Sequence, residues 1–250
     1  MSGNLWYRLA APQTFYPFAA RVIPWCSALA LLLGITGLYM AFFVAPTDAQ
    51  QGEAYRIIFI HVPAAWLSMF IYAVMAFWSA VGLIWRTRLS SLLAQALAPT
   101  GAMFTVIALW TGAFWGKPTW GTYWVWDARL TSELLLLFLY VGFMALTRAF
   151  PDSPRGDRAG QLIALVGAAN LPVIYFSVQW WNTLHQGASV SLTKAPSMAS
   201  IMLLTMLVLA LAGWAYSIAV AMMRVRRLIV WRERHARWVQ ELLHQKGAGV

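Results

Sequence analysis

Six apolar segments divide the chain, and they constrain its fold more than any other feature. Each is close to the roughly 20 helical residues that cross the hydrocarbon core of a bilayer. They lie at residues 22–44, 62–85, 93–114, 131–149, 160–181 and 199–222. Since backbone polar groups inside lipid must be hydrogen-bonded within the chain, each segment is expected to be a helix. The sequence therefore predicts an all-α integral membrane protein, a bundle of six transmembrane helices.

The composition supports a membrane protein with one domain. Of the 250 residues, 61% are hydrophobic and only 10% are charged, whereas a soluble domain carries about 25% charged residues. The net charge of +10 would suit nucleic acid only if a soluble fold gathered it on one face. Here the basic residues fall in short loops and a tail between apolar segments. No internal repeat or long linker interrupts the chain, so residues 1–250 are expected to form a single domain.

The distribution of basic residues predicts the orientation of the bundle. If both termini are cytoplasmic, most of the 18 Lys and Arg residues lie on the inner side. The exceptions are Arg56, Lys117, Arg129 and Lys194. Because basic residues are retained on the cytoplasmic side of a membrane, this asymmetry favours cytoplasmic N- and C-termini.

Both ends of the chain are expected to lie at the inner membrane surface. The first 20 residues are too polar and aromatic for the apolar core of a cleaved signal peptide, so they are interpreted as an interfacial segment. The tail, about residues 224–250, reads "RVRRLIVWRERHARWVQELL" over most of its length. Its apolar residues at helical spacing are Leu228, Trp231, Trp238 and Leu242. This pattern is typical of a basic amphipathic helix on an anionic leaflet, acting either as a simple anchor or as a docking site for a cytoplasmic partner.

A tryptophan-rich segment, "WGKPTWGTYWVWDARLTSE" at residues 115–133, lies between the third and fourth spans. It holds four tryptophans, and Trp110 lies just before it, so five of the chain's 15 fall between residues 110 and 126: Trp110, Trp115, Trp120, Trp124 and Trp126. An interfacial aromatic belt accounts for one or two such residues at a helix end. It does not account for a loop of about residues 110–133 that alternates glycine with tryptophan and continues into "WDAR". The segment is predicted to be an aromatic binding surface in an outer loop.

Two histidines flank this loop on the same side of the membrane. Pro63 fits the first turn of a helix, which places His61 just before the second span. His185 follows the fifth span at a matching depth. Each alone is better explained as an interfacial polar residue, whereas two on one face, with none in the spans, fit metal ligands equally well.

The ligand set favours haem over a bare metal ion. Two histidines are too few for a closed zinc site, and the single Cys26 excludes CxxC and CxxCH motifs. A porphyrin already supplies four nitrogens, so haem iron needs only two axial ligands. Aromatic faces pack against a porphyrin ring, and Arg56, Arg129 and Lys117 are the outer cations available for its carboxylates.

Two polar residues near this surface leave their roles open, and a proline shapes the span beside it. Asp127 could cap the helix that leads into the fourth span, pair with Arg129 or Arg56, or orient a ligand histidine. Glu133 lies near the outer end of the fourth span, at an uncertain depth. Pro172 is expected to kink the fifth span and tilt the end that carries His185 over the site.

Three segments carry a resemblance to a known family. The segments "WGKPTWGTYWVWDARLTSELLLLFLY", "YRIIFIHVPAAW" and "WWNTLHQGAS" resemble the tryptophan-rich (WWD-domain) haem-handling proteins, specifically the CcmC family of bacterial cytochrome c maturation system I. The resemblance covers most of residues 45–190. Tyr123 departs from the pattern, since relatives often have tryptophan there.

The resemblance implies a function and its partners. A protein of this family binds haem b at the periplasmic face of the bacterial inner membrane and presents it to the haem chaperone CcmE. It works with the ABC transporter subunits CcmA and CcmB and the small membrane protein CcmD. By motif, His61 and His185 would be the axial iron ligands of a bis-histidine site. The platform would comprise Trp115, Trp120, Trp124, Trp126 and Asp127. Arg56 and Arg129 match positions in the same motifs, and their role at the propionates is inferred from their charge.

The resemblance implies a carrier of haem rather than an enzyme. The chain has no GxxxxGK[ST] phosphate loop, so a partner must use any ATP. Two other classes compete with this interpretation. A solute transporter would carry inverted repeats and ionisable residues at mid-membrane. A membrane haem protein for electron transfer would place histidines within the spans on facing helices.

Overall fold

The computed structural model describes residues 11–150, 153–181, 183–185, 190 and 196–247. Six helical stretches in this part of the chain are long and apolar enough to cross a membrane, which confirms the predicted all-α, six-span fold. They are Pro12–Val44, Glu53–Trp85, Arg88–Trp120, Ala128–Ala149, Pro154–Trp180 and Ser200–Arg232.

Some of these stretches combine more than one helix. The first joins α2 (Pro12–Tyr39) to a π-helical turn, η1 (Met40–Val44), and the second joins a 3₁₀ turn, η2 (Glu53–Ile57), to α3 (Ile58–Trp85). The others are α4 (Arg88–Trp120), α5 (Ala128–Ala149), α6 (Pro154–Gly167) with α7 (Asn170–Trp180), and α8 (Ser200–Arg232). A short helix, α9 (Arg237–Gly247), follows α8.

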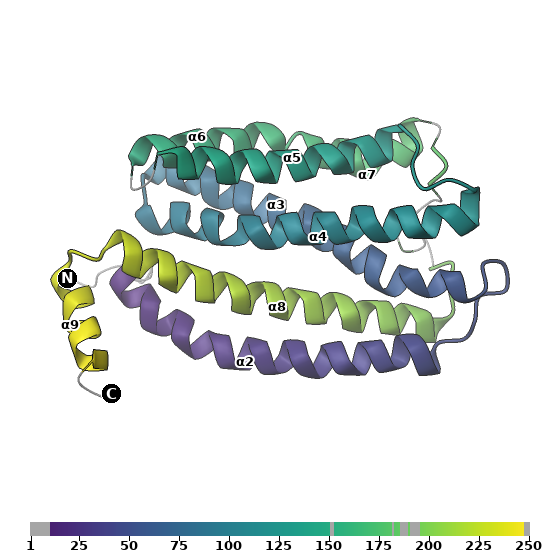
Figure 1. Cartoon of the computed structure of the whole chain (residues 1–250), viewed down its shortest axis with the longest axis horizontal. Helices are drawn as coiled ribbons and strands as arrows, with labels where there is room; N and C mark the ends of the chain where they lie inside the picture. The colour runs from purple at the N-terminus through teal and green to yellow at the C-terminus, as the bar shows by residue number, and fades with distance from the viewer. Residues whose placement is uncertain (1–10, 151–152, 182, 186–189, 191–195, 248–250) are drawn as a thin grey trace.

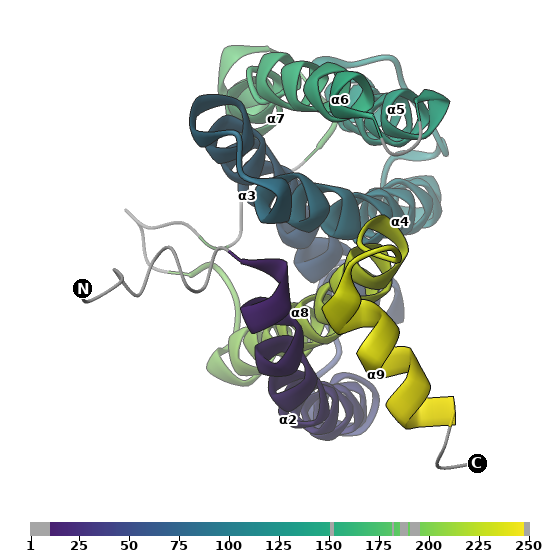
Figure 2. The same ribbon diagram turned by 90° about the vertical axis from the view of Figure 1, so that its left-hand side faces the viewer.

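The helices form three layers that run the length of the molecule (Figures 1 and 2). One outer layer is the pair α2 and α8, and the other contains α5, α6 and α7. Between them lie α3 and α4, which contact helices of both outer layers. The start of α2 and the end of α8 lie at the same end of the bundle (Figure 1). The turns before α3, between α4 and α5, and after α7 gather at the opposite end.

All six spans are longer than predicted, and two of the extensions matter most for the interpretation of the sequence. The first begins at Pro12 rather than near residue 22, because proline is well suited to the first position of a helix. The helix expected to end at residue 114 continues through Pro118 to Trp120. The tryptophan-rich loop expected at about 110–133 is therefore short, covering only residues 121–127 between α4 and α5.

The start of the second span also differs from the prediction. His61 was expected just before the helix, with Pro63 in its first turn. In the structure α3 begins at Ile58 and continues η2, so His61 lies within the helix and Pro63 in its interior. The helical backbone before His61 fixes the direction of its side chain more firmly than a loop would.

The fifth span is broken, as the proline within it suggested. α6 ends at Gly167 and α7 begins at Asn170. Pro172 has no N–H to donate to the carbonyl of Ala168, so a regular hydrogen bond is missing at the break. The Leu171 N–H instead donates to that carbonyl oxygen over a shorter loop, at 3.1 Å.

Glycine contacts allow the central helices to approach closely. A Cβ at Gly101 of α4 would lie 2.1 Å from the ring of Tyr140 on α5, and one at Gly167 would lie 2.1 Å from the Tyr72 hydroxyl. The Tyr140 hydroxyl donates to the carbonyl of Ser68 on α3 at 2.7 Å. Small residues of this kind are the usual means of close helix packing in membranes. These contacts join α4 to α5 and α6 to α3, and the Tyr140 hydroxyl also joins α5 to α3.

The amphipathic tail is divided between two helices. α8 continues through Arg232, and α9 leaves its end at an angle (Figure 1). Part of the apolar face of α9 packs on α2, because Val239 is buried and the Trp238 ring lies 6.0 Å from that of Tyr16. Trp231 and Leu243 remain exposed. Anchoring in the interface and docking of a partner therefore both stay open for this exposed part.

Candidate functional site

A pocket opens at the end of the bundle where α3 begins and α4 ends. It has an empty volume of about 700 Å³, part of which is open to solvent. Its walls come from the start of α3, the last turns of α4, residues 122–125, the start of α5 and residues 184–185. Segments far apart in the sequence thus meet here, including both histidines predicted on the outer side.

His61 is held in one orientation by α4. Its Nδ1 lies 3.0 Å from Thr111 Oγ1, and the Thr111 hydroxyl donates to the carbonyl of Ile107 at 2.6 Å. Since that proton is already used, the hydroxyl accepts from an Nδ1–H group. The Nε2 atom then carries the lone pair that a metal requires. A Cβ at Gly112 would lie 3.0 Å from His61 Cε1, so a glycine there lets the imidazole lie against α4.

His185 faces His61 across the pocket. The two ring centroids are 6.3 Å apart with an angle of 36° between the planes. Two imidazoles that bind opposite sides of one metal ion, each at about 2 Å, have ring centres roughly 6 Å apart. Within the described part of the chain, no group of three or more His, Cys, Asp or Glu residues is arranged to hold a metal ion. The pair suits a metal that brings its remaining ligands with it.

Three of the tryptophans line the pocket. Trp115 is buried, its indole N–H donates to Gln51 Oε1 at 2.7 Å, and its ring meets His61 edge-on at 5.7 Å. The Trp120 ring lies 6.2 Å from that of His185. Trp124 also lines the pocket, and its buried indole N–H has no acceptor among the described residues. Together they give the pocket broad aromatic walls beside both imidazoles.

The other two tryptophans of the segment lie outside the pocket. Trp110 is 65% exposed and stacks on Phe114 at 5.5 Å, on the outer surface of α4. Trp126 is 77% exposed and meets the edge of Trp124 at 5.3 Å. Tyr123 lines the pocket and is half-exposed at its rim. The segment thus divides into an inward-facing set and an outward-facing set.

Two charged residues of α5 line the pocket, one turn apart. Arg129 is the only predicted cation that reaches the pocket among the described residues, and its guanidinium donates to the carbonyl of Ile174 at 2.6 Å. Glu133 is buried, and its Oε1 accepts a hydrogen bond from Ser68 at 2.8 Å. Sequence reasoning left the depth of Glu133 open. Its charge within an apolar span was the available signal.

The remaining predicted polar residues have partners elsewhere. Asp127 caps α5, accepting from the Leu130 N–H through Oδ1 at 2.8 Å, while Oδ2 is buried with no partner among the described residues. Arg56 pairs with Glu53 and donates to the carbonyl of Ala45 at 3.0 Å. Neither Asp127 nor Arg56 lines the pocket. Of the three roles considered for Asp127, capping is the one that the structure contains.

The fold and the pocket together define a class of protein: a six-span membrane bundle with an aromatic pocket between two histidines at one end. Over residues 5–240 the chain matches the family model described as CcmC, heme exporter protein C. It is 46% identical to "Heme exporter protein C" of Escherichia coli (strain K12) over 242 residues, which cover 96% of this chain and 97% of that relative.

Other relatives agree in name and extent. The chain is 52% identical to "Heme exporter protein C" of Bradyrhizobium diazoefficiens over 204 residues, covering 82% of this chain and 77% of the relative. It is 45% identical to a "Putative cytochrome c biosynthesis ccmC-like mitochondrial protein" of Marchantia polymorpha over 176 residues, covering 70% and 73%. The chain therefore belongs to the CcmC, or heme exporter protein C, family. This confirms the resemblance and the expectation that the chain is a carrier component rather than an enzyme.

Proposed function

We propose that this protein binds haem b at the periplasmic face of the bacterial inner membrane and presents it to the haem chaperone CcmE during cytochrome c maturation. The observation that carries the proposal is the facing pair His61 and His185, at 6.3 Å between ring centroids in an aromatic pocket. Membership of the family supports it, because its members are named heme exporters.

Each wall of the pocket suits one part of haem. The imidazoles suit the iron, because each can supply one axial nitrogen. The rings of Trp120 and Trp124 suit the faces of the porphyrin. Arg129 and the indole N–H of Trp124, which has no acceptor among the described residues, are donors for a propionate. Arg56, also predicted for this role, would have to leave Glu53 to take part.

The rim of the pocket suits a partner that collects the ligand. Trp126 and Tyr123 are exposed beside the pocket, and exposed aromatic residues are common anchors in protein interfaces. We infer that CcmE approaches over these rings, with CcmA, CcmB and CcmD as the other members of the complex. The orientation follows from the basic residues: the end of the bundle opposite the pocket carries most of them, so that end is cytoplasmic.

The pocket chemistry favours this function over the alternatives. A solute transporter would place its binding site near mid-membrane, whereas this pocket lies at one end of the bundle. A haem protein for electron transfer would bury its histidines within the spans. Here His185 follows α7 and lies outside the spans, whereas His61 lies within the second span but near its start, in the first turn of α3.

The direct test is to purify the protein after co-expression with CcmE. We expect haem to co-purify, with the absorption spectrum of low-spin, six-coordinate iron, and haem to become covalently attached to CcmE only when this protein is present. Absence of haem from the folded, co-expressed protein would refute the proposal. Bound haem without transfer to CcmE would refute the presentation step alone.

Thr111 provides a test of how His61 is oriented. Thr111→Val keeps the shape of the side chain but removes the oxygen that receives His61 Nδ1–H. Because loss of such a supporting partner typically lowers metal affinity 10- to 100-fold, haem affinity is expected to fall by about tenfold. Haem titration followed by absorption measures it. Thr119→Val is the matched control, since the Thr119 hydroxyl donates to the carbonyl of Trp115 on the same helix, whereas the Thr111 hydroxyl contacts His61. Equal effects of the two variants would contradict the role given to Thr111.

A further inference from the structure

A second pocket lies at the other end of the bundle, and the proposed function does not use it. It is formed by the turn between α3 and α4, the start of α6 and the end of α8. Its empty volume is about 1470 Å³, including the open mouth. Three arginines, Arg86, Arg88 and Arg158, line it and are exposed. The space is too large for one small ion and is bordered by cations.

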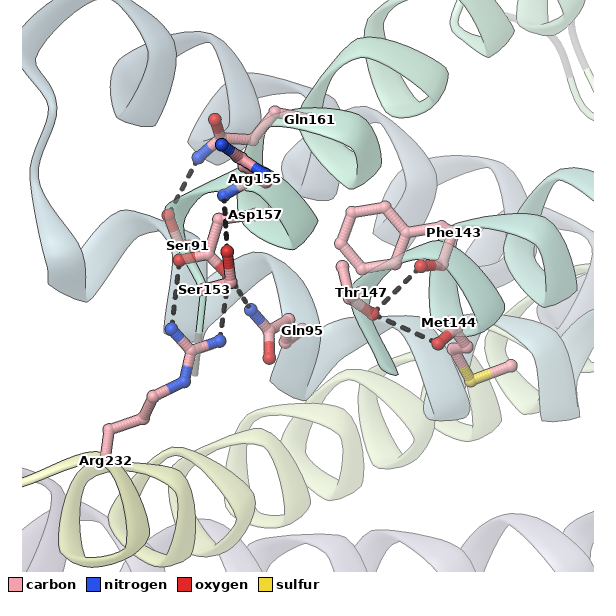
Figure 3. Close-up of polar contacts among 10 residues, drawn as sticks. All are labelled: Ser91, Gln95, Phe143, Met144, Thr147, Ser153, Arg155, Asp157, Gln161 and Arg232. Carbon is pink, nitrogen blue, oxygen red and sulfur yellow. Dashed lines mark hydrogen bonds and ion pairs between the residues drawn. The ribbon is translucent and has the colours of Figure 1, made fainter. Parts of the chain in front are cut away.

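A hydrogen-bonded network that includes several lining residues borders this pocket (Figure 3). The Arg232 guanidinium binds both carboxylate oxygens of Asp157, at 2.8 and 3.1 Å, and Gln95 Nε2 donates to the same carboxylate at 2.8 Å. Behind them, Gln161 Nε2 donates to Ser91 Oγ at 2.7 Å, with both residues buried. Asp157 thus has its charge satisfied by Arg232, so it does not neutralise the arginines at the mouth.

Four arginines and two acidic residues line this pocket, so its lining carries a net positive charge. Arg86, Arg88 and Arg158 form no ion pair with any residue that the structure describes. Glu233 also lines the pocket, but its Oε2 accepts from the indole N–H of Trp238 at 2.9 Å, toward α9. Three like charges around one hollow repel each other, and an anion in the hollow relieves that repulsion.

The backbone at Arg86 indicates that its side chain matters. Arg86 ends α3 with φ 53° and ψ 35°, the left-handed conformation, and it is the single non-glycine residue with positive φ in the described chain. Glycine is the usual residue at such a helix end, because a side chain there is strained. An arginine kept at this cost points to a use for its charge.

The depth of the pocket indicates the source of the anion. The pocket lies where four helices end at the membrane boundary, on the side that the proposed orientation makes cytoplasmic. Leu83 and Leu92 supply apolar parts of its lining, and Ile84 and Trp85 are exposed beside it. A ligand that combines phosphates with acyl chains matches both the cations and this apolar border. Basic pockets between helices on the cytoplasmic side are known to suit such headgroups.

We propose that this pocket binds the phosphates of an anionic phospholipid from the cytoplasmic leaflet, with a diphosphate headgroup of the cardiolipin type as the best match to three arginines. The site is separate from the haem pocket and rests only on the proposed orientation of the bundle. Loss of the lipid therefore leaves haem binding intact, and failure of haem binding would leave the lipid site standing.

The test compares two triple variants in the full-length protein. Arg86→Gln, Arg88→Gln and Arg158→Gln remove the arginines at the mouth. The matched control, Arg21→Gln, Arg234→Gln and Arg237→Gln, removes the same charge from exposed arginines that do not line the pocket. Delipidated protein in detergent is titrated with cardiolipin, with phosphatidylcholine and with inorganic phosphate, and binding is read by native mass spectrometry.

We expect the unmodified protein to bind cardiolipin in preference to phosphatidylcholine. The first triple variant should bind it at least about tenfold more weakly, and the control within about twofold of the unmodified protein. Equal losses of cardiolipin affinity in both triple variants would show that only net charge matters, which would refute a specific site. If millimolar inorganic phosphate competes and the protein shows no preference for lipid, the ligand is a soluble anion and the lipid proposal is refuted. Unchanged lipid binding with weaker co-purification of partner subunits would overturn it in favour of an acidic protein segment.

A single variant separates binding from folding. Arg86→Gly removes one cation but places the residue best suited to positive φ at the helix end. We expect its thermal stability without lipid to equal or exceed that of the unmodified protein, while cardiolipin binding weakens about threefold or more. Full cardiolipin affinity in this variant would show that Arg86 does not contribute to lipid binding.

Discussion

His61→Ala and His185→Ala should each abolish the low-spin absorption spectrum of bound haem. Each variant removes one of the two imidazoles that face each other across the pocket, so the iron keeps at most one protein ligand. Loss of a residue that merely supports a ligand costs 10- to 100-fold in metal affinity. Loss of the ligand itself should lower haem occupancy after purification by at least about tenfold. Absorption spectra and haem quantification of the purified variants measure both effects.

Free imidazole provides the control for this prediction. Added to either variant, it should bind the iron in place of the missing histidine and restore a low-spin spectrum. A variant that lost haem because its fold was damaged would not recover the spectrum in this way. His235→Ala with His244→Ala removes two histidines at the opposite end of the bundle, in the turn before α9 and in α9 itself, and should leave the spectrum unchanged. An unaltered low-spin spectrum in both single variants would show that other residues bind the iron.

The sequence was sufficient to predict the architecture, because lipid leaves the backbone few choices. Six apolar segments had to become helices, and an even number of spans brings the two ends of the chain to the same side. The same reasoning brought His61 and His185 to one end of the bundle, because the second span was expected to begin just after His61 and the fifth to end just before His185. The break before Pro172 followed from the missing N–H of proline.

The helix ends could not be predicted from hydropathy. Their true positions decide which tryptophans face the pocket and which face outward. Polar and aromatic residues near Lys117 read as a loop, yet α4 continues to Trp120. On a helix, residues five positions apart point in different directions. Trp110 and Trp115 therefore belong to opposite environments, one exposed and one buried. Spacing within an assumed loop gave no way to make that distinction.

Side-chain contacts between segments far apart in the chain could not be predicted from the sequence either. Nothing local to Thr111 indicates that it receives the His61 proton, and nothing local to Arg56 indicates its contact with the carbonyl of Ala45. Glu133 was recognisable only as a charge near the end of a span. Its contact with Ser68 depends on the close approach of α3 and α5.

The division of the tryptophans leads to the second large effect. Trp120→Ala with Trp124→Ala removes two aromatic walls of the pocket, and each aromatic contact with a planar ring is worth about 0.5–1.5 kcal/mol beyond its buried area. Haem affinity should therefore fall by roughly tenfold to a hundredfold. The helical content should stay unchanged, because neither ring belongs to the buried core clusters. Haem titration and circular dichroism measure the two quantities.

Trp110→Ala with Trp126→Ala is the matched control, since it removes two tryptophans of the same segment that lie outside the pocket. Haem affinity should stay within about twofold, while transfer of haem to CcmE should slow if the exposed Trp126 ring is where the chaperone docks. A loss of haem from this control equal to that of the pocket variant would contradict the inward and outward division. That result would assign Trp126 to the haem-binding surface. Normal haem affinity in both double variants would instead indicate that the whole segment is an interfacial aromatic belt.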